Sequence, residues 1–377
     1  MTLESQPRAR VEALGIEDLR LAIASDAAPE RNGVGAYYED LIGYLKPRVS
    51  QIELFSPTIE DGVWNAGVVL PMPGDTTQKL CFPNVYTLRR DLADLDPHVM
   101  IIPTPGVYGV SGAFLAARRG IPVLTGFHTS FEQLAELYWH GSLTGRVFLQ
   151  YIDKTHRYLI RKSAAVMVNS SDMEAEARSI GARNVVRIGT PLSRLFATHP
   201  VAPYGGDFGN LLFAGRLAAE KNIASIVEAA RQLPSLTFRI AGDGPLRATV
   251  EAAAHELPNV HYLGWLSREE LRDQVDACDG LLLPSHFESF GTIALEAMSR
   301  NRVVIVSRAA GITDWEPLTC GLEIIGDGGL IASLKRLIEI GADGRRTLAQ
   351  RAHNAAHGFN EENLRGWEDL LVEIANR

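Results

Sequence analysis

The sequence predicts an α/β protein made of two Rossmann-like domains that face each other across a cleft. Short apolar segments alternate with amphipathic ones along most of the 377 residues, a length that suits two domains with a core each. A stretch rich in proline and glycine, residues 190–209, separates the halves. Because ligands of open parallel sheets bind beyond the carboxyl ends of the strands, two facing sheets would hold a ligand between them.

Five apolar segments predict the strands of the first sheet. They are residues 19–25, 51–56, 99–103, 123–127 and 165–169. Most are nearly continuous in Ile, Val and Leu, as in a parallel sheet with both faces covered. Residues 51–56 alternate more, which predicts a place nearer the sheet edge. Helices are expected between the strands, for example at residues 112–119 and 171–180.

The second half repeats this rhythm. Strands are predicted at residues 210–214, 236–241, 260–263, 280–283 and 303–307, and helices at residues 223–232, 245–256, 268–277, 292–299 and 330–340. The predicted domains are residues 1–190 and 191–359, followed by a C-terminal helix at residues 360–377. Its apolar side chains lie on one helix face, which we expect to pack back on the first domain: Leu364, Trp367, Leu370, Leu371 and Ile374.

Composition narrows the class of protein. Hydrophobic residues make up 46% and charged residues 22%, as in soluble globular proteins. The net charge of −8 does not favour nucleic acid as a partner. The N-terminus lacks a signal-peptide pattern and no apolar run reaches the ~20 residues that span a bilayer, so a cytoplasmic place is expected. Three cysteines without close spacing predict neither a disulfide framework nor a metal site.

Two cations follow the predicted strand at residues 210–214. Arg216 and Lys221 lie five positions apart beyond its carboxyl end, where they could clamp a diphosphate and stabilise a leaving phosphate. The alternative is a pair of surface cations without a ligand.

A glycine turn follows the next strand. Gly242 is a candidate phosphate contact in Gly242-Asp243-Gly244-Pro245, and Pro245 suits the first position of a helix. The turn lacks the full G-x-G-x-x-G pattern, which favours a structural role. After the third strand, Trp265 could border a nucleotide base, although packing is the favoured interpretation.

The segment 284–292 (PSHFESFGT) runs from a strand into a helix. Gly291 and Thr292 would lie at the helix start, where backbone N–H groups and the dipole bind anions. Glu288 precedes the helix and Glu296 lies inside it, and carboxylates accept hydrogen bonds from vicinal sugar hydroxyls. The alternative is an acid favoured by the dipole plus a solvated Glu. However, Glu296 lies in an apolar stretch, so its charge requires a partner.

Together these motifs resemble the donor half of glycosyltransferase family 4. Arg216 with Lys221, the 242–245 turn, and Glu288 and Glu296 with seven residues between them match that family's pattern. The first half is similar too. Residues 29–35 (PERNGVG), with Gly33 and Gly35, resemble the glycine loop that approaches the donor phosphates. Residues 126–131 (GFHTSF) resemble the segment whose histidine, here His128, meets the donor sugar.

The sequence departs from the family pattern at two places. Gly189-Thr190-Pro191-Leu192 replaces a Gly-Val-Asp turn, which puts the geometry of the linker in doubt. Arg300-Asn301-Arg302 replaces the Gly-x-Pro that stops the glutamate helix. Neither change removes a residue to which a catalytic role is assigned.

The resemblance implies the GT-B fold, a retaining mechanism and a nucleoside-diphosphate sugar, linked to UDP or GDP, as donor. It implies catalytic roles for Arg216, Lys221, Glu288 and His128, with Glu296 on the ribose. The sugar nucleotide is a co-substrate, and neither a cofactor nor a metal is expected. The first domain would read the acceptor, which could be a glycan, a lipid or a small molecule. Residues 138–162, aromatic and basic, fit a peripheral contact at the inner face of a membrane or an ordinary solvated helix.

Three other functions compete with a transferase. A hydrolase or epimerase acting on sugar nucleotides would share the scaffold. A regulatory nucleotide-sugar-binding protein would need none of the catalytic residues, yet Arg216, Lys221, Glu288 and Glu296 are all present. A dehydrogenase is disfavoured because the dinucleotide glycine fingerprint with its following acid is missing.

Overall fold

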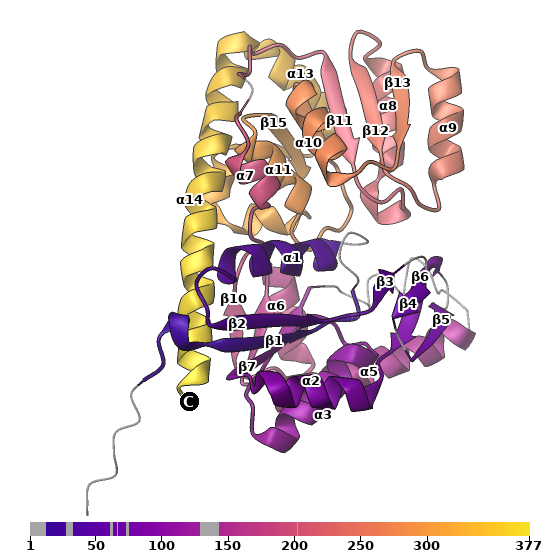
Figure 1. Cartoon of the computed structure of the whole chain (residues 1–377). Coiled ribbons are helices and arrows are strands. Elements are labelled where there is room, and N and C mark those ends of the chain that lie inside the picture. The colour runs from indigo at the N-terminus through magenta and orange to yellow at the C-terminus, as the bar shows by residue number, and fades with distance from the viewer. Residues whose placement is uncertain are drawn as a thin grey trace, which may run out of the picture.

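The computed structural model describes residues 13–27, 33–60, 63–65, 67–72, 75–128, 143–201 and 203–377. Each half of the chain forms a six-stranded parallel sheet with helices on both faces, one above the other in Figure 1. The predicted α/β class with two Rossmann-like domains is confirmed. The first sheet ends at Arg187 and the second begins at Asn210, so the proline- and glycine-rich segment connects them. The domain bounds at residues 190 and 359 stay predictions.

The first sheet has the strand order β10-β9-β8-β7-β1-β2. Its strands are β1 (Arg20–Ala24), β2 (Gln51–Phe55), β7 (Val99–Ile102), β8 (Val123–Phe127), β9 (Ala165–Val168) and β10 (Val185–Arg187). All five predicted strands are confirmed, with β2 at the edge. Leu21 and Ile23 enter one core and Ala22 and Ala24 another, so both faces of the strand are covered and the run is apolar throughout.

Around this sheet lie the 3-10 turn η1 (Ile16–Asp18) and the helices α1 (Gly33–Leu45), α2 (Val85–Leu95), α3 (Val107–Arg119), α5 (Leu143–Lys162) and α6 (Ser171–Ser179). Helix α3 begins five positions before the predicted start at Gly112. The half-buried carboxylate of Asp26 accepts hydrogen bonds from the backbone N–H groups of Tyr108 (2.8 Å) and Gly109 (3.2 Å). This tertiary cap stabilises the early start, and local sequence could not reveal it.

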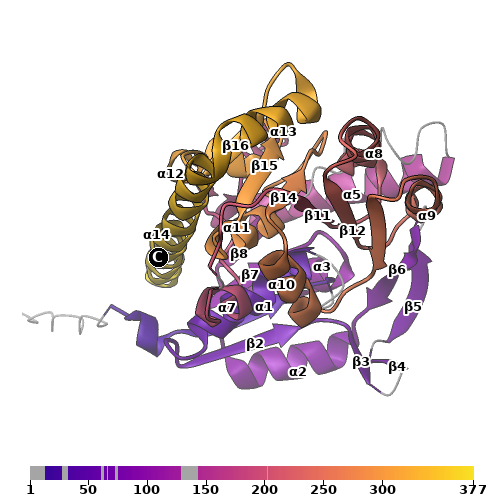
Figure 2. The ribbon, with the colours of Figure 1, turned by 90° about the horizontal axis from the view of Figure 1, so that it is seen from above.

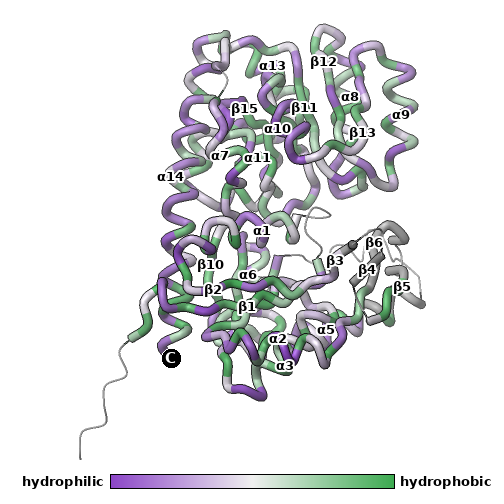
Figure 3. The backbone as a smooth tube through the Cα atoms, viewed as in Figure 1, coloured by the Kyte–Doolittle hydropathy of each residue, from purple (hydrophilic) through white to green (hydrophobic). Residues whose placement is uncertain are grey.

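Two antiparallel strand pairs lie beside the first sheet: β3 (Thr58–Glu60) with β4 (Val63–Asn65), and β5 (Val68–Met72) with β6 (Asp75–Phe82). Val68 lies opposite Phe82, and both are exposed together with Leu70. At the start of α2, Val85 and Tyr86 are exposed as well. We call these five side chains the hairpin patch, and Figure 3 shows the hydrophobic colour of β5 at the edge of the domain.

The second sheet has the order β13-β12-β11-β14-β15-β16. Its strands are β11 (Asn210–Ala214), β12 (Thr237–Ala241), β13 (Val260–Gly264), β14 (Gly280–Leu283), β15 (Val303–Ser307) and β16 (Leu322–Ile325). Its helices are α8 (Ile223–Gln232), α9 (Arg247–Glu256), α10 (Arg268–Ala277), α11 (Thr292–Ser299), α12 (Glu316–Thr319) and α13 (Gly329–Glu339), with 3-10 turns η2 (Ala219–Lys221) and η3 (Gly311–Asp314). Helix α9 begins at Arg247, so the placement of Pro245 at its first position was wrong.

The faces of the second sheet are covered by different helices. Side chains of α10, α11 and α14 join one core, and side chains of α8, α9 and α13 join the other. Figure 2 shows α14 on one side of the strands and α8 and α9 on the other. The carboxyl ends of β11 and β14 are neighbours in this sheet, so the loops that follow them meet.

One helix joins the domains. Helix α14 (Gly341–Ala375) starts well before residue 360, so the predicted C-terminal helix was too short. Ala352 and Phe359 pack in the second domain, whereas Trp367 and Ile374 pack against the first sheet. Figure 1 shows α14 running along both domains. Three glycines, at positions 341, 344 and 358, weaken the helical signal of the earlier part, and packing on both domains overrides it.

The connection between the domains is held by α14. The Asn363 side chain accepts from Gly189 N–H (2.7 Å), and the Asn360 side chain accepts from Leu192 N–H (2.8 Å). A short helix, α7 (Arg194–Thr198), follows. The unusual Gly189-Thr190-Pro191-Leu192 segment is therefore fixed by polar side chains of α14 on either side of its proline.

Candidate functional site

A lysine and a glutamate meet at the carboxyl edge of the second sheet. Lys221 Nζ lies 2.5 Å from Glu288 Oε2, and about one sixth of each side chain is exposed. Lys221 ends the turn after β11, and Glu288 lies in the loop after β14. The structure thus brings together two of the predicted catalytic residues, which are 67 positions apart in sequence.

Backbone hydrogen bonds hold this pair in place. His286 N–H donates to Glu220 O (2.8 Å), and Gly311 N–H donates to Glu288 O (2.8 Å). A Cβ at Gly311 would lie 2.1 Å from Ser289 O, so the loops after β14 and β15 pack backbone to backbone. Phe290 is buried against Phe359 of α14, which anchors the loop from below. These backbone contacts and the buried Phe290 therefore hold the loop that carries Glu288.

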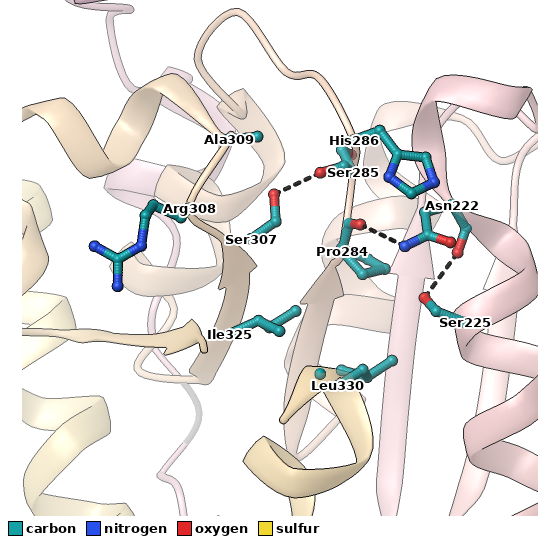
Figure 4. Close-up of a pocket in the computed structure, with 11 residues that line it drawn as sticks. Asn222, Ser225, Pro284, Ser285, His286, Ser307, Arg308, Ala309, Ile325 and Leu330 are labelled. Atoms are coloured by element: carbon teal, nitrogen blue, oxygen red, sulfur yellow. Dashed lines mark hydrogen bonds between the residues drawn. The ribbon is translucent and has the colours of Figure 1, made fainter. Parts of the chain in front are cut away.

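The lining of a pocket of about 360 Å³ includes Asn222, the residue after Lys221, and His286, on the loop that carries Glu288. Figure 4 shows its lining, from the start of α8 and the ends of β14, β15 and β16. Asn222 donates to Pro284 O (3.1 Å), and Ser307 donates to Ser285 O (2.6 Å). The first bond joins the loops on which Lys221 and Glu288 lie, and the second joins the Glu288 loop to the end of β15. Arg308 extends away from the other lining side chains in this view.

Gly242 supports the loop that carries Arg216. A Cβ at Gly242 would lie 1.9 Å from Gly215 O, and Gly242 has a φ of 130°. At Gly244 a Cβ would lie 2.6 Å from Leu217 O. The glycines let two strand-end loops touch. The structure therefore favours the structural interpretation of this turn, and Arg216 lies between the two contact points, half-buried.

The start of α11 faces the same edge. Gly291 adopts a φ of 102° and precedes the helix without a side-chain cap, and Thr292 is its first residue. A Cβ built at Gly291 would lie 3.6 Å from Glu288 Cγ, so the helix start adjoins Glu288. Uncapped N–H groups and the positive end of the helix dipole favour an anion at this place.

Glu296 has the partner that its apolar surroundings require. Its carboxylate is buried, and Arg268 Nη2 lies 3.3 Å from Oε1. The same Arg268 atom lies 2.9 Å from Asp40 Oδ2 on α1 of the first domain. Burial raises the pKa of Glu296 to about 8, and Arg268 opposes this rise. Arg268 and Asp40 were not predicted as site residues, because no local pattern links them to Glu296.

His128 follows β8 and is buried against α1. Its Nε2 lies 2.9 Å from the Tyr38 hydroxyl, and its ring lies 5.0 Å from that of Tyr37. Burial lowers the pKa of His128 to about 4, so the ring is neutral near pH 7. Its Nδ1 has no hydrogen-bond partner among the described residues, which leaves one ring nitrogen for a ligand. Gly126 makes room, since a Cβ there would lie 2.5 Å from Nε2.

The remaining predicted residues lie along α1. Gly33 and Gly35 begin this helix, on which Tyr38 and Asp40 follow. Residues 29–32 of the glycine loop and residues 129–131 after His128 lie outside the described residues. The described contacts place His128 and α1 together in one domain and Lys221 with Glu288 in the other. Asp40 and Arg268 join the two sides.

Two other observations complete the site. The side chain of Trp265 is 64% exposed, so the favoured packing interpretation was wrong.

At the end of α11, Asn301 adopts a φ of 59°, the left-handed conformation that a glycine would otherwise supply. Arg300 is fully buried and pairs with Asp276 at 2.7 Å. The departure from Gly-x-Pro therefore keeps the helix stop.

Within the described ranges, no group of three or more His, Cys, Asp and Glu side chains could hold a metal ion. In the same part of the chain, none of the helices has both the length and the apolarity to cross a bilayer. The candidate site contains two cations, an uncapped helix start, two carboxylates and a neutral imidazole. Such a set suits a diphosphate joined to hydroxyl-rich groups.

Two family models match the chain, one in each half. Residues 31–192 match Glycosyltransferase Family 4, and residues 205–316 match Glycosyl transferases group 1. The chain belongs to the family 4 glycosyltransferases. It is an enzyme of the GT-B fold, and the predicted resemblance is confirmed.

Similar proteins agree with this assignment. An uncharacterized glycosyltransferase of Bacillus subtilis is 23% identical over 300 residues, which cover 76% of this chain and 77% of the relative. The sucrose-phosphate synthase structure from Thermosynechococcus elongatus has a TM-score of 0.69 at 16% identity, covering 93% of this chain and 97% of the other. The Anabaena HepE structure in complex with UDP and glucose has a TM-score of 0.65 at 17% identity, covering 93% and 100%.

Proposed function

We propose that this glycosyltransferase moves a hexose from a UDP- or GDP-linked sugar to an acceptor hydroxyl with retention of anomeric configuration. The observation that carries the proposal is the Lys221–Glu288 pair beside the uncapped start of α11. A cation, a helix dipole and a carboxylate within one loop cluster suit the junction of a sugar and a diphosphate. The UDP complex of the similar HepE structure makes UDP the first nucleotide to test.

The proposed roles follow the placement of the side chains. Arg216 and Lys221 stabilise the charge that builds on the departing diphosphate, and the backbone at Gly35, Gly291 and Thr292 adds contacts. Glu288 and His128 orient the hexose, and Glu296 accepts hydrogen bonds from the ribose. Because His128 is neutral near pH 7, it acts as a hydrogen-bonding group and not as a cation.

The bond between the anomeric carbon and the phosphate oxygen breaks, and the bond to the acceptor oxygen forms on the same face. The acceptor proton passes to a phosphate oxygen of the leaving nucleotide. Catalysis then rests on positioning and preorganised charge. The sugar nucleotide is a co-substrate, so the proposal assigns charge stabilisation to side chains and uses no cofactor.

We propose that the first domain binds the acceptor and makes a peripheral membrane contact. The hairpin patch presents Val68, Leu70 and Tyr86 to solvent, and exposed apolar groups of this size suit a lipid surface. Helix α5 adds Val147 and Tyr151 and carries four cations near its end: Lys154, Arg157, Arg161 and Lys162. A lipid acceptor would be taken from that surface, whereas a glycan or small-molecule acceptor would leave the patch without an occupant.

Sedimentation with vesicles tests the contact. Vesicles that contain phosphatidylglycerol should bind the protein more than vesicles of phosphatidylcholine alone, and Leu70→Ser with Tyr86→Ser should abolish binding. Ile338→Ser is the matched control, because this exposed apolar side chain lies on α13 of the other domain. Equal binding by both variants, or none by the wild type, would contradict the contact.

The transfer itself is tested by titration calorimetry with UDP and GDP, followed by product analysis with the matching sugar nucleotides. Selective binding of one nucleotide and acceptor-dependent formation of a glycoside with the donor's anomeric configuration are expected. Free sugar formed at the same rate without any acceptor would indicate a hydrolase. Binding without turnover across acceptor classes would indicate the regulatory alternative.

A further inference from the structure

One arginine bridges carboxylates from both domains. Arg268 begins α10, and its Nη2 contacts Asp40 of α1 at 2.9 Å and Glu296 of α11 at 3.3 Å. The exposed fractions of the three side chains are 27%, 11% and 7%. Such a shared guanidinium in a largely buried place couples the two carboxylates more strongly than a surface ion pair would.

Arg268 offsets part of the negative charge of the acidic side chains around this bridge. Glu39 and Asp40 face it from α1, and Glu296 faces it from α11. The groups that face Asp40 from the linker are Ser193 and the backbone N–H of Arg194. Without the guanidinium, two buried carboxylates would lie near one another with only hydrogen-bond donors left to stabilise them. Like charges at such a distance favour protonation of one member.

We propose that Arg268 is a positioning residue for the donor nucleotide, which keeps the Glu296 carboxylate ready for the ribose and ties it to the facing domain through Asp40. This inference rests on the proposed function, because that proposal assigns the ribose to Glu296. An ionised carboxylate accepts hydrogen bonds from both ribose hydroxyls, whereas a protonated one has less acceptor capacity. Arg268 acts through Glu296 and need not touch the nucleotide.

The bridge gives nucleotide binding a characteristic pH dependence. Burial raises the pKa of Glu296, Arg268 lowers it, and the Asp40 charge raises it. Loss of Arg268 therefore moves the pKa of Glu296 further up, and loss of the Asp40 charge moves it down. In the wild type, affinity for the nucleotide should rise as the pH increases through about 8, where Glu296 ionises.

The experiment measures UDP affinity by calorimetry from pH 6 to pH 9.5 for the wild type, Arg268→Gln, Arg268→Lys, Asp40→Asn and the Arg268→Gln/Asp40→Asn double variant. GDP replaces UDP if the wild type prefers it. The corresponding 2′,3′-dideoxynucleotide serves as a second probe, because it lacks the hydroxyls that Glu296 would bind. Arg231→Gln, an arginine of α8 paired with Glu256, is the matched control, and thermal melting checks that each variant folds.

We expect Arg268→Gln to weaken UDP binding at pH 7 by about tenfold and to move the rise in affinity to a pH about one unit higher. Arg268→Lys should lie between this variant and the wild type. Adding Asp40→Asn to Arg268→Gln should recover part of the loss. Wild type and Arg268→Gln should bind the dideoxynucleotide equally, and Arg231→Gln should match the wild type throughout.

Two results overturn the inference. If Arg268→Gln loses the same affinity for both probes at every pH, the residue supports only the scaffold. If Arg268→Gln binds UDP as the wild type does, Glu296 does not depend on it. In both cases the wild type still binds nucleotide and the proposed function stands. A wild type that binds neither UDP nor GDP overturns the proposed function and this inference together.

Discussion

Lys221 Nζ and Glu288 Oε2 lie 2.5 Å apart at the meeting point of the loops after β11 and β14. The cation is thus held by a carboxylate in the free protein, and in the proposed reaction the donor diphosphate would share it. A preformed pair of this kind keeps the lysine at one place and leaves little reorganisation for the reaction step.

Lys221→Ala should lower kcat by about a thousandfold, since it removes a cation from the departing diphosphate. Because the pair is mostly buried, the variant leaves the Glu288 charge without this partner, and the free energy of unfolding should fall by about 1–3 kcal/mol. Steady-state kinetics and urea unfolding measure the two effects. Lys335→Ala, on the exposed side of α13, should change neither. Turnover at the wild-type rate in Lys221→Ala would rule out the proposed role.

Glu288→Ala should impair the choice of sugar more than affinity for free nucleotide. We expect kcat/KM for the preferred donor to fall about a hundredfold, with the dissociation constant of UDP changed by no more than about threefold. Competition between sugar nucleotides, together with calorimetry, tests this. Losses of equal size in both quantities would contradict the assignment of Glu288 to the hexose.

Gly242→Ala should destabilise the protein by about 2–4 kcal/mol, because the new Cβ would collide with Gly215 O and the φ of 130° disfavours alanine. The shifted 215–217 loop should also weaken nucleotide binding through Arg216. Gly366→Ala is the matched control: it lies within α14 with open space around it, so it should be neutral or stabilising by about 0.5–1 kcal/mol. Urea unfolding that showed the two variants alike would contradict the close packing.

Acid should destabilise the first domain through two buried histidines. Burial lowers the pKa of both His128 and His156 from 6.5 to about 4. Between pH 6.5 and about 4 the unfolded chain takes up these protons and the folded chain does not, so stability falls as the pH decreases. Each histidine contributes about 1.4 kcal/mol per pH unit in this window. Urea unfolding at pH 7 and pH 5 should show a smaller difference in His156→Phe than in the wild type.

Glu296→Gln should stabilise the protein while it weakens nucleotide binding. The raised pKa of Glu296 means that the folded state keeps a proton which the unfolded state loses above pH 4.5. Wild-type stability therefore decreases from pH 4.5 to about 8 and then levels off, whereas the variant lacks this loss. The advantage of the variant should grow over this range to about 1–4 kcal/mol. A constant difference from pH 4.5 to pH 9 would indicate that Glu296 is ionised throughout.

The strands could be predicted closely because local sequence decides them. In β11, Leu211 and Phe213 enter one core, and Leu212 and Ala214 enter the other. Because both faces of the strand are buried, all four consecutive residues are apolar. The candidate site could be predicted only where its residues lie in short motifs. Lys221 follows Arg216 in one such motif, and Glu288 precedes Glu296 by the family's spacing in another. In contrast, Tyr38 beside His128 and Arg268 beside Glu296 follow no such pattern.

The boundaries that failed were those set by distant contacts. Asp26 extends α3 toward its N-terminus, and packing on both domains lengthens α14 past the glycines that weaken its local signal. Trp265 was expected to pack because tryptophan is usually buried, but it ends up exposed after β13. Both helix boundaries depend on neighbours that are far away in the chain.

By itself, the sequence determined the alternation of strands and helices, the segment between the halves, and the motifs that it shares with family 4 glycosyltransferases. These follow from periodicity and from short motifs, which are local properties of the chain. Only the tertiary structure decided which loops meet, which carboxylate receives a cation, and how Asp40 of one domain reaches Glu296 of the other through Arg268. Burial and pairing depend on distances in space, and these exist only after the chain has folded.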